Sequence, residues 1–430
     1  MAKRLHAGAP GFAENFSGLL AAQRETAEDV DGAVRAILAD VAERGDAALL
    51  DYTRRFDRLD LARPKLRVAR EEIDGAVASC DGEALDALRF AKERIEAFHA
   101  AQRPADRRET DALGVTLGWR WTALESVGLY VPGGTASYPS SVLMNAVPAR
   151  VAGVPRVAMV VPAPGGVLNP LVLAAASLAG VDEIYRVGGA QAVAALAYGT
   201  ETIPAVAKIV GPGNAYVAAA KRRVFGLVGI DSIAGPSEVL ILADGTANPD
   251  WVAADLLAQA EHDPSAQAIL ITDSASLADA VEVGVERQLA TLPRAAIAQK
   301  SWAEHGALIL VETLEDAVPL VDRLAPEHLE IQAAGADGLA GRIRNAGAIF
   351  LGPHTPEAIG DYVGGPNHVL PTARTARFSS GLSVLDFMKR TSILQCDAEA
   401  LRALGPAAMA LGRAEGLEAH ARSVAIRLDT

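Results

Sequence analysis

The feature that most constrains this fold is a regular alternation of apolar strand-like runs and helix-like runs through the middle of the chain. A first series pairs strands with helices at residues 157–161 with 171–178, 183–187 with 190–197, and 207–210 with 215–225. A second series places strands at 238–243, 268–272, 308–311 and 348–351, with helices at 251–261, 274–289 and 313–324. Because parallel strands are joined by crossover helices, this rhythm predicts two α/β halves with parallel sheets, meeting near residues 230–238.

Composition narrows the class of protein. A chain of 430 residues is expected to form more than one domain. Its formal net charge of -13 disfavours nucleic acid or an anionic membrane surface as the main partner. Two cysteines form no disulfide framework, which fits a reducing cytoplasm. A long uncharged run, residues 157–181, is broken by prolines and glycines, so we expect no membrane span.

The segment around Gln259 and His262 offers possible metal ligands. The two side chains are three residues apart, so on a helix they share a face. An amide oxygen and an imidazole nitrogen can both bind a borderline metal ion. The alternative is a polar helix face that ends at Pro264.

Glu327 and His328 are adjacent and follow Pro326, at the start of a new element. A histidine can deprotonate an alcohol near neutral pH, and a glutamate can activate water. Neighbouring side chains point in different directions, so Glu327 and His328 could act in two successive reaction steps rather than on one proton. The alternative is a surface turn.

Two later segments add further candidate ligands. Asp361 and His368 lie in a loop rich in glycine and proline, and carboxylate and imidazole groups are good zinc ligands. Glu415 and His420 are five residues apart, which places them about 140° apart on a regular helix. Either the helix breaks near Gly416, or the two side chains contact a ligand from different directions.

Glycine-rich turns suggest a nucleotide site only weakly. Residues 186–191 and 210–214 follow strands and open helices, where backbone amides can hold a pyrophosphate, but neither matches Gly-x-Gly-x-x-Gly. A tight strand-to-helix turn is the plainer interpretation of both. Tyr130 in another glycine turn can stack on a base or simply pack, and Ser237 can bind substrate or cap a turn.

Taken together, these segments resemble histidinol dehydrogenase from about residue 24 to residue 422. The matching stretches, in order, are 128–134 (GLYVPGG), 187–191 (VGGAQ), 208–216 (KIVGPGNAY), 230–238 (IDSIAGPSE), 259–264 (QAEHDP), 325–330 (APEHLE), 360–362 with 365–371 (GDY, GPNHVLP) and 378–383 (FSSGLS). Each is modest alone, but the order and spacing make the set very specific.

The resemblance implies oxidation of L-histidinol to L-histidine through the aldehyde in two NAD-dependent steps, with one zinc ion per active site. It implies that Glu327 and His328 are the acid–base pair. The implied zinc ligands are Gln259, His262, Asp361 and His420. The implied NAD contacts are Tyr130, Gln191 and Asn214. The implied substrate contacts are Ser237, Gln259, His262, His328, Asp361, His368, Glu415 and His420.

The resemblance also implies a homodimer in which the tail of one chain reaches the site of the other. The expected fold is α/β, with two Rossmann-like parallel-sheet domains, an N-terminal arm and a C-terminal helical tail. The expected boundaries are 1–25 for the arm, 26–128 with 239–382 for a first, discontinuous domain, 129–238 for a second, NAD-binding domain, and 383–430 for the exchanged tail.

Simple chemistry is consistent with that implication. Histidinol carries an imidazole and an amine, and both can bind zinc, which would fix the substrate in place. Zinc has no redox role, so NAD would accept each hydride. Neither Cys80 nor Cys396 lies in a motif, which favours a hydrated aldehyde over a thiohemiacetal in the second step.

Two other functions remain open at this stage. One is a related zinc- and NAD-dependent dehydrogenase acting on another small alcohol, such as a sulfonated diol, although the acidic Glu415 favours a cationic substrate. The other is a zinc- or nucleotide-binding protein without turnover, against which the Glu327–His328 pair argues.

Overall fold

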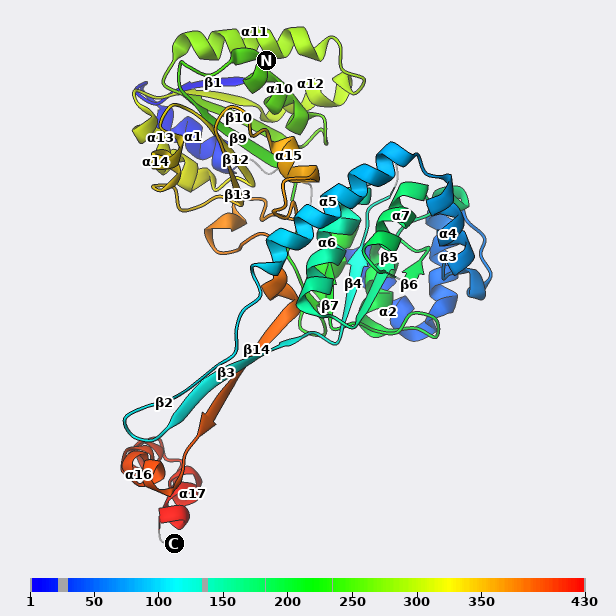
Figure 1. Cartoon of the computed structure of the whole chain (residues 1–430). Helices are drawn as coiled ribbons and strands as arrows, with labels where there is room; N and C mark the ends of the chain where they lie inside the picture. Colours follow the sequence, from blue (N-terminus) through cyan, green and yellow to red (C-terminus); the bar gives the residue numbers. More distant parts are fainter. Residues whose placement is uncertain (1, 22–29, 134–137, 182, 234, 429–430) are drawn as a thin grey trace.

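The computed structural model describes residues 2–21, 30–133, 138–181, 183–233 and 235–428. These residues form two lobes, each built on a parallel sheet, and a long antiparallel arm that extends away from both (Figure 1). None of the described helices has the length and apolarity that crossing a membrane would require.

The first lobe is built on a six-stranded parallel sheet with the order β1-β11-β10-β9-β12-β13. Its strands are β1 (Lys3–His6), β9 (Glu238–Ala243), β10 (Gln267–Thr272), β11 (Ala307–Leu310), β12 (His328–Gln332) and β13 (Ala348–Leu351). One face packs on α10 (Pro249–Ala260), α11 (Ala275–Leu289) and α12 (Ala295–His305). The other face packs on α1 (Phe12–Ala21), α13 (Leu314–Leu324) and α14 (Ala336–Ala340). The central strands β9 and β10 are buried along their whole length, as expected for a sheet covered on both faces.

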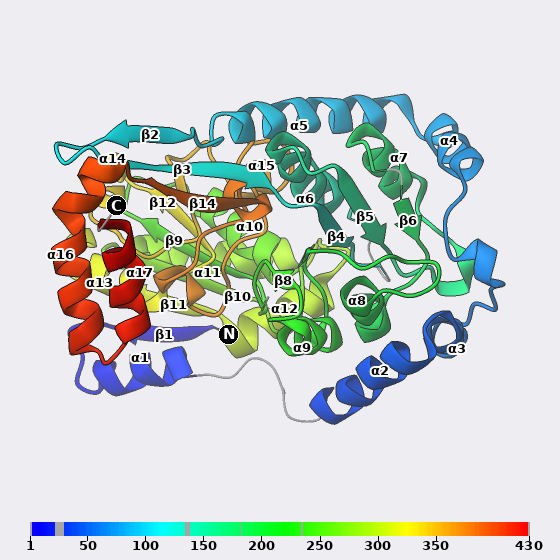
Figure 2. The same ribbon diagram turned by 90° about the horizontal axis from the view of Figure 1, so that it is seen from below.

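The second lobe is built on a five-stranded parallel sheet with the order β6-β5-β4-β7-β8. Its strands are β4 (Ser126–Tyr130), β5 (Arg156–Val160), β6 (Glu183–Tyr185), β7 (Lys208–Val210) and β8 (Gly229–Ile230). Figure 2 shows helices on both of its sides. One side carries α4 (Arg70–Ser79), α5 (Gly82–Ala100), α6 (Pro139–Ala152) and α7 (Pro170–Leu178). The other carries α2 (Val30–Arg44), α3 (Asp46–Phe56), α8 (Gly189–Tyr198) and α9 (Ala215–Val224).

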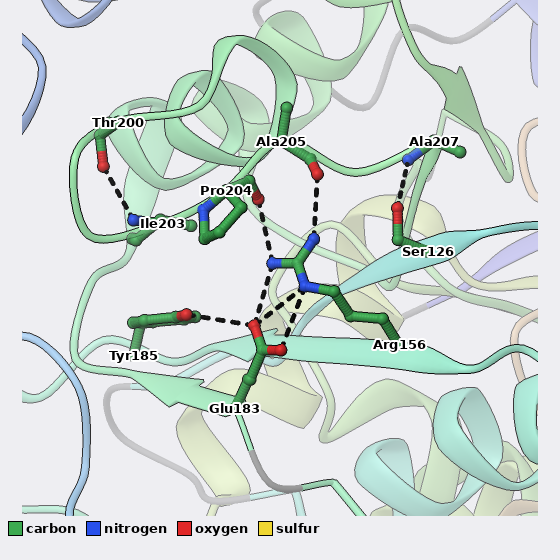
Figure 3. Close-up of polar contacts among 9 residues, drawn as sticks. All are labelled: Ser126, Arg156, Glu183, Tyr185, Thr200, Ile203, Pro204, Ala205 and Ala207. Carbon is green, nitrogen blue, oxygen red and sulfur yellow. Dashed lines mark hydrogen bonds and ion pairs between the residues drawn. The ribbon is translucent and has the colours of Figure 1, made fainter.

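The strand order of the second lobe reverses between β4 and β7. The chain runs from β4 outward to β5 and β6, then returns to the opposite side of β4 as β7. Ligands of open α/β sheets bind at such a reversal, outside the carboxyl ends of the strands. At the other end of β5, the Arg156 guanidinium donates to the Glu183 carboxylate (2.9 Å) and to the Ala205 carbonyl (2.9 Å) (Figure 3). These bonds hold the segment that leads into β7.

The arm consists of β2 (Arg107–Thr110), β3 (Thr116–Ala123) and β14 (Met388–Gln395), paired in antiparallel fashion. Beyond it, α16 (Ala398–Ala414) and α17 (Glu418–Leu428) form a helical pair at the far end of the arm (Figure 1). The C-terminal helices therefore lie away from both lobes of their own chain.

The predicted fold class is confirmed: both parallel sheets and the C-terminal helical region are present. The packing departs from the expected grouping of segments in three places. In residues 1–25, β1 is an edge strand of the six-stranded sheet rather than part of a separate arm. In residues 26–128, helices α2 to α5 pack in the cores of the five-stranded lobe, whereas β2 and β3 belong to the arm. Residues 383–430 contain the strand β14 before the two helices. This strand was not expected, because its partner β3 lies far away in sequence.

Candidate active site

The adjacent Glu327 and His328 lie at the amino edge of the six-stranded sheet, where β9 and β12 begin. The α13 helix ends at Ala325 in a left-handed conformation (φ 45°), and this turn sends the chain directly into β12. The backbone amide of Glu238 donates to Glu327 Oε2 (2.9 Å), and the carbonyl of Glu238 lies 3.0 Å from His328 Nδ1. One residue of the neighbouring strand therefore orients both candidate catalytic side chains.

The imidazole of His328 is arranged as a neutral base. Since a carbonyl can only accept, the proton lies on Nδ1, and Nε2 carries the lone pair. This Nε2 atom is buried without a hydrogen-bond partner among the described residues, 3.8 Å from Asp361 Oδ1. Burial lowers the pKa of His328, while the charge of Asp361 opposes that change. At neutral pH the ring is therefore unprotonated at the nitrogen that faces the site.

Helix α15 (Glu357–Tyr362) adds two carboxylates. Glu357 and Asp361 are four residues apart and face the same way, and with His328 they form a group whose ligand atoms lie within 4.8 Å of one another. Burial raises the pKa of Glu357 well above its usual value, and the nearby carboxylates add to this effect. Sequence reasoning missed Glu357, because α15 is too short to show a periodic pattern.

Gln259 and His262 approach from α10. Gln259 is fully buried in the last turn of that helix, and in the described part of the chain neither atom of its amide group has a hydrogen-bond partner. His262 follows the helix end and is exposed. Burial is the main cause that lowers the pKa of His328 and of His368, and repulsion from His262 adds to it.

The donor set fits a zinc ion. A buried amide without a partner is unfavourable unless a ligand occupies it. By residue type, Gln259 Oε1, the His262 imidazole and the Asp361 carboxylate are suitable zinc donors. Asp361 also belongs to the His328, Glu357 and Asp361 group, whose ligand atoms lie within 4.8 Å of one another.

His368 connects this site to the second lobe. Its Nδ1 lies 3.0 Å from the Asp361 carbonyl, and its Nε2 lies 3.2 Å from the hydroxyl of Ser141 on α6. Nearby, Arg94 of α5 donates to the Val363 carbonyl (2.8 Å). These contacts hold the loop after α15 between the two lobes and so fix the position of Asp361. Ser237 is half-buried immediately before β9, at the same amino edge.

A buried polar network lies behind the site, and sequence reasoning missed it. The Gln332 amide donates to Asp255 Oδ2 (2.8 Å) and to Glu330 Oε2 (2.8 Å), and the backbone amide of Glu357 donates to Glu330 Oε1 (2.8 Å). Burial, with the charge of Asp255, raises the pKa of Glu330 to about 8. The network ties α10, β12 and α15 together.

The candidate cofactor residues gather at the carboxyl edge of the five-stranded sheet. Tyr130 ends β4, and its hydroxyl accepts the Gly189 amide (3.0 Å). Gln191 is buried in the first turn of α8, and Asn214 caps α9 by accepting the amides of Tyr216 and Val217. Two helix N-termini thus meet at the strand-order reversal, a suitable place for a pyrophosphate. Tyr130 is only 4% exposed, so it packs in the core of this lobe.

Glu415 and His420 are not brought to this site by their own chain. The α16 helix ends at Ala414, Gly416 adopts a left-handed conformation (φ 75°), and α17 begins at Glu418. The helix therefore breaks near Gly416, which was the first of the two alternatives for this segment. Both side chains are exposed on the helical pair at the end of the arm (Figure 1).

Comparison with known proteins agrees with the geometry. The family model for histidinol dehydrogenase matches residues 20–428. The chain is 69% identical over 429 residues to a histidinol dehydrogenase from Rhodopseudomonas palustris and, again over 429 residues, 69% identical to one from Bradyrhizobium diazoefficiens, covering 100% of both chains in each case. The chain belongs to the histidinol dehydrogenase family. A crystal structure of histidinol dehydrogenase from Elizabethkingia anophelis superposes with a TM-score of 0.95 at 36% identity, covering 100% of this chain and 98% of that one.

As a member of the histidinol dehydrogenase family, the protein is an oxidoreductase. One chain brings Glu327, His328 and Asp361 together, with His368 beside them. Glu415 and His420, the expected site residues of the tail, lie at the end of the arm of the same chain. The expected NAD contacts lie on the five-stranded lobe.

Proposed function

We propose that this protein oxidises L-histidinol to L-histidine through histidinal, as a step of histidine biosynthesis. The observation that carries the proposal is the buried, unpartnered Nε2 of His328, 3.8 Å from Asp361 and beside Glu327, in a chain that is 69% identical to histidinol dehydrogenases. A neutral imidazole aimed into a carboxylate-rich site is suited to take a proton from an alcohol.

Each of the two steps would use one NAD, which accepts a hydride when bound. In the first step, His328 Nε2 takes the hydroxyl proton as the hydride leaves the carbinol carbon. The Nδ1 contact with the Glu238 carbonyl keeps the ring in the required tautomer, and Asp361 stabilises the imidazolium that forms.

The second step requires water to add to the aldehyde before another hydride can leave. The carboxylate of Glu327 is held beside His328, with 3.7 Å between Oε2 and Nδ1, and it is our candidate base for that water. A cysteine route lacks support, since Cys80 is half-buried with its thiol on the Ala76 carbonyl (3.2 Å) and Cys396 is exposed beyond the arm.

Zinc would hold the imidazole and the amine of the substrate, with Gln259, His262, Asp361 and His420 as ligands. His420 would come from a second copy, as would Glu415, which would pair with the substrate ammonium. We therefore propose a homodimer with exchanged tails, acting in the cytoplasm on a small molecule rather than on nucleic acid. The position of both residues at the end of the arm supports this assignment.

The test is the yield of NADH per L-histidinol with zinc present, and we expect two. One NADH would contradict the second step. Turnover of another small alcohol, such as a sulfonated diol, without turnover of histidinol would instead indicate a related dehydrogenase. Absence of any turnover would indicate a binding protein.

A further inference from the structure

A buried ion pair lies directly behind the expected dinucleotide turn. Lys221 on α9 and Asp231 just after β8 form this pair, with side chains 3% and 4% exposed. The Lys221 ammonium donates to the Gly211 carbonyl (3.0 Å), and the Gly211 amide donates to Asp231 Oδ2 (2.7 Å). The two charges therefore hold both main-chain polar groups of a single residue.

Gly211 directly follows β7 and packs against the end of β4. Its φ of +112° is open to glycine and not to other residues. A Cβ atom added there would lie 2.2 Å from the Tyr130 carbonyl oxygen, so the ends of the two strands approach as closely as backbone permits. The next three residues lead to Asn214, the cap of α9.

Burying two charges is a poor way to stabilise a fold, because desolvation offsets much of their attraction. Most other ion pairs of the described residues lie on exposed side chains, such as Arg223 with Asp31 on the outer side of the same helix. Neutral groups would suffice merely to satisfy one amide and one carbonyl. The charged pair instead fixes the Gly211 peptide groups from both directions.

We propose that Lys221 and Asp231 are a positioning pair for the dinucleotide: they hold the 211–214 turn, which leads into α9, in the conformation that receives the pyrophosphate. This inference rests on the proposed use of NAD at this edge. Neither residue is placed in contact with the cofactor, and both act through the turn.

The experiment compares Lys221→Met, the double variant Lys221→Met/Asp231→Asn, and Arg223→Met as a matched control on the same helix. The double variant carries no unpaired buried charge and keeps an oxygen for the Gly211 amide, so it is expected to fold even if Lys221→Met does not. Each full-length protein is assayed for the KM of NAD, kcat, the KM of histidinol, zinc content and urea unfolding.

We expect the KM of NAD to rise about tenfold in Lys221→Met and in the double variant, since a charged hydrogen bond to the turn is lost. The kcat at saturating NAD, the KM of histidinol and the zinc content should change less than about twofold, and Arg223→Met should match the wild type.

Recovery of both stability and NAD affinity in the double variant would overturn the inference, because the pair would then serve only the fold. A KM of NAD within about twofold of wild type in both variants would overturn it as well. A wild-type protein that does not use NAD would reject the proposed function instead, so the two failures can be told apart.

Discussion

At the scale of single residues, the site is organised by Glu238, which carries no expected chemistry of its own. Its amide and carbonyl orient the two neighbouring side chains Glu327 and His328. Because the main chain of Glu238 binds both side chains, the proposed base for the alcohol (His328) and the proposed base for water (Glu327) keep fixed positions relative to each other. Their separate roles can be tested one residue at a time.

Changing Glu327→Gln should slow oxidation of histidinal by about 10²- to 10⁴-fold and leave the alcohol step much less affected. The amide keeps an oxygen for the Glu238 amide but cannot take a proton from water. Single-turnover measurements started from histidinol and from histidinal separate the two steps. Equal slowing of both would reject the water-activation role.

The raised pKa of Glu330 predicts a pH-dependent stability. A carboxyl whose pKa rises on folding binds its proton more tightly in the folded state, so stability is fully present below the unfolded pKa of 4.5 and is lost as pH rises toward about 8. The loss is at most about 1.4 kcal/mol per pH unit. Glu330→Gln should reduce this slope in urea unfolding of chelator-treated protein between pH 5 and 8.

The exposed Glu304 provides a matched control, and Glu304→Gln should keep the wild-type slope. If Glu330→Gln and wild type lost stability in parallel over this range, the carboxyl would not be the source of the pH dependence.

At the scale of elements, sequence pattern predicted the segments whose burial follows from their own residues. The strands of both parallel sheets are apolar runs, so β9, β10 and β11 could be located closely. The polar strands β1, β2 and β14 could not, because most of their residues are exposed. The partners of β1 and β14 are also distant in sequence.

The same distinction applies to the site. Gln259 and His262 could be proposed together because local helix spacing joins them. Asp255 and Glu330 could not, since only the packing of α10 against β12 brings them to one Gln332 amide. Helix α15 is six residues long, too short for a periodic signal that would have placed Glu357 beside Asp361.

Helix α10 yields a direct test of the metal assignment. His262→Ala should lose zinc and activity together, and Gln259→Ala should weaken zinc retention in competition with a chelator, because each removes one of four ligands. His354→Ala, which changes an exposed histidine of the same lobe, is the control and should retain zinc. Full zinc content in the His262 variant would remove that residue from the ligand set.

At the scale of the whole molecule, the two sheets use opposite edges. The candidate catalytic residues lie at the amino edge of the six-stranded sheet, whereas the expected NAD contacts lie at the carboxyl edge of the five-stranded sheet. His368 links the lobes through Ser141, so the loop after α15 depends on both. The arm carries the last two expected site residues away from this assembly (Figure 1).

The central claim is that each active site needs the tail of a second copy, and subunit complementation tests it most directly. Chains with His262→Ala and chains with His420→Ala, carrying different affinity tags, are co-expressed, and hybrid dimers are isolated by both tags. Each parent dimer should be inactive, whereas the hybrid contains one intact site and should show about half of the wild-type activity per dimer. A hybrid as inactive as its parents would contradict the claim, because His262 and His420 would then act within one chain.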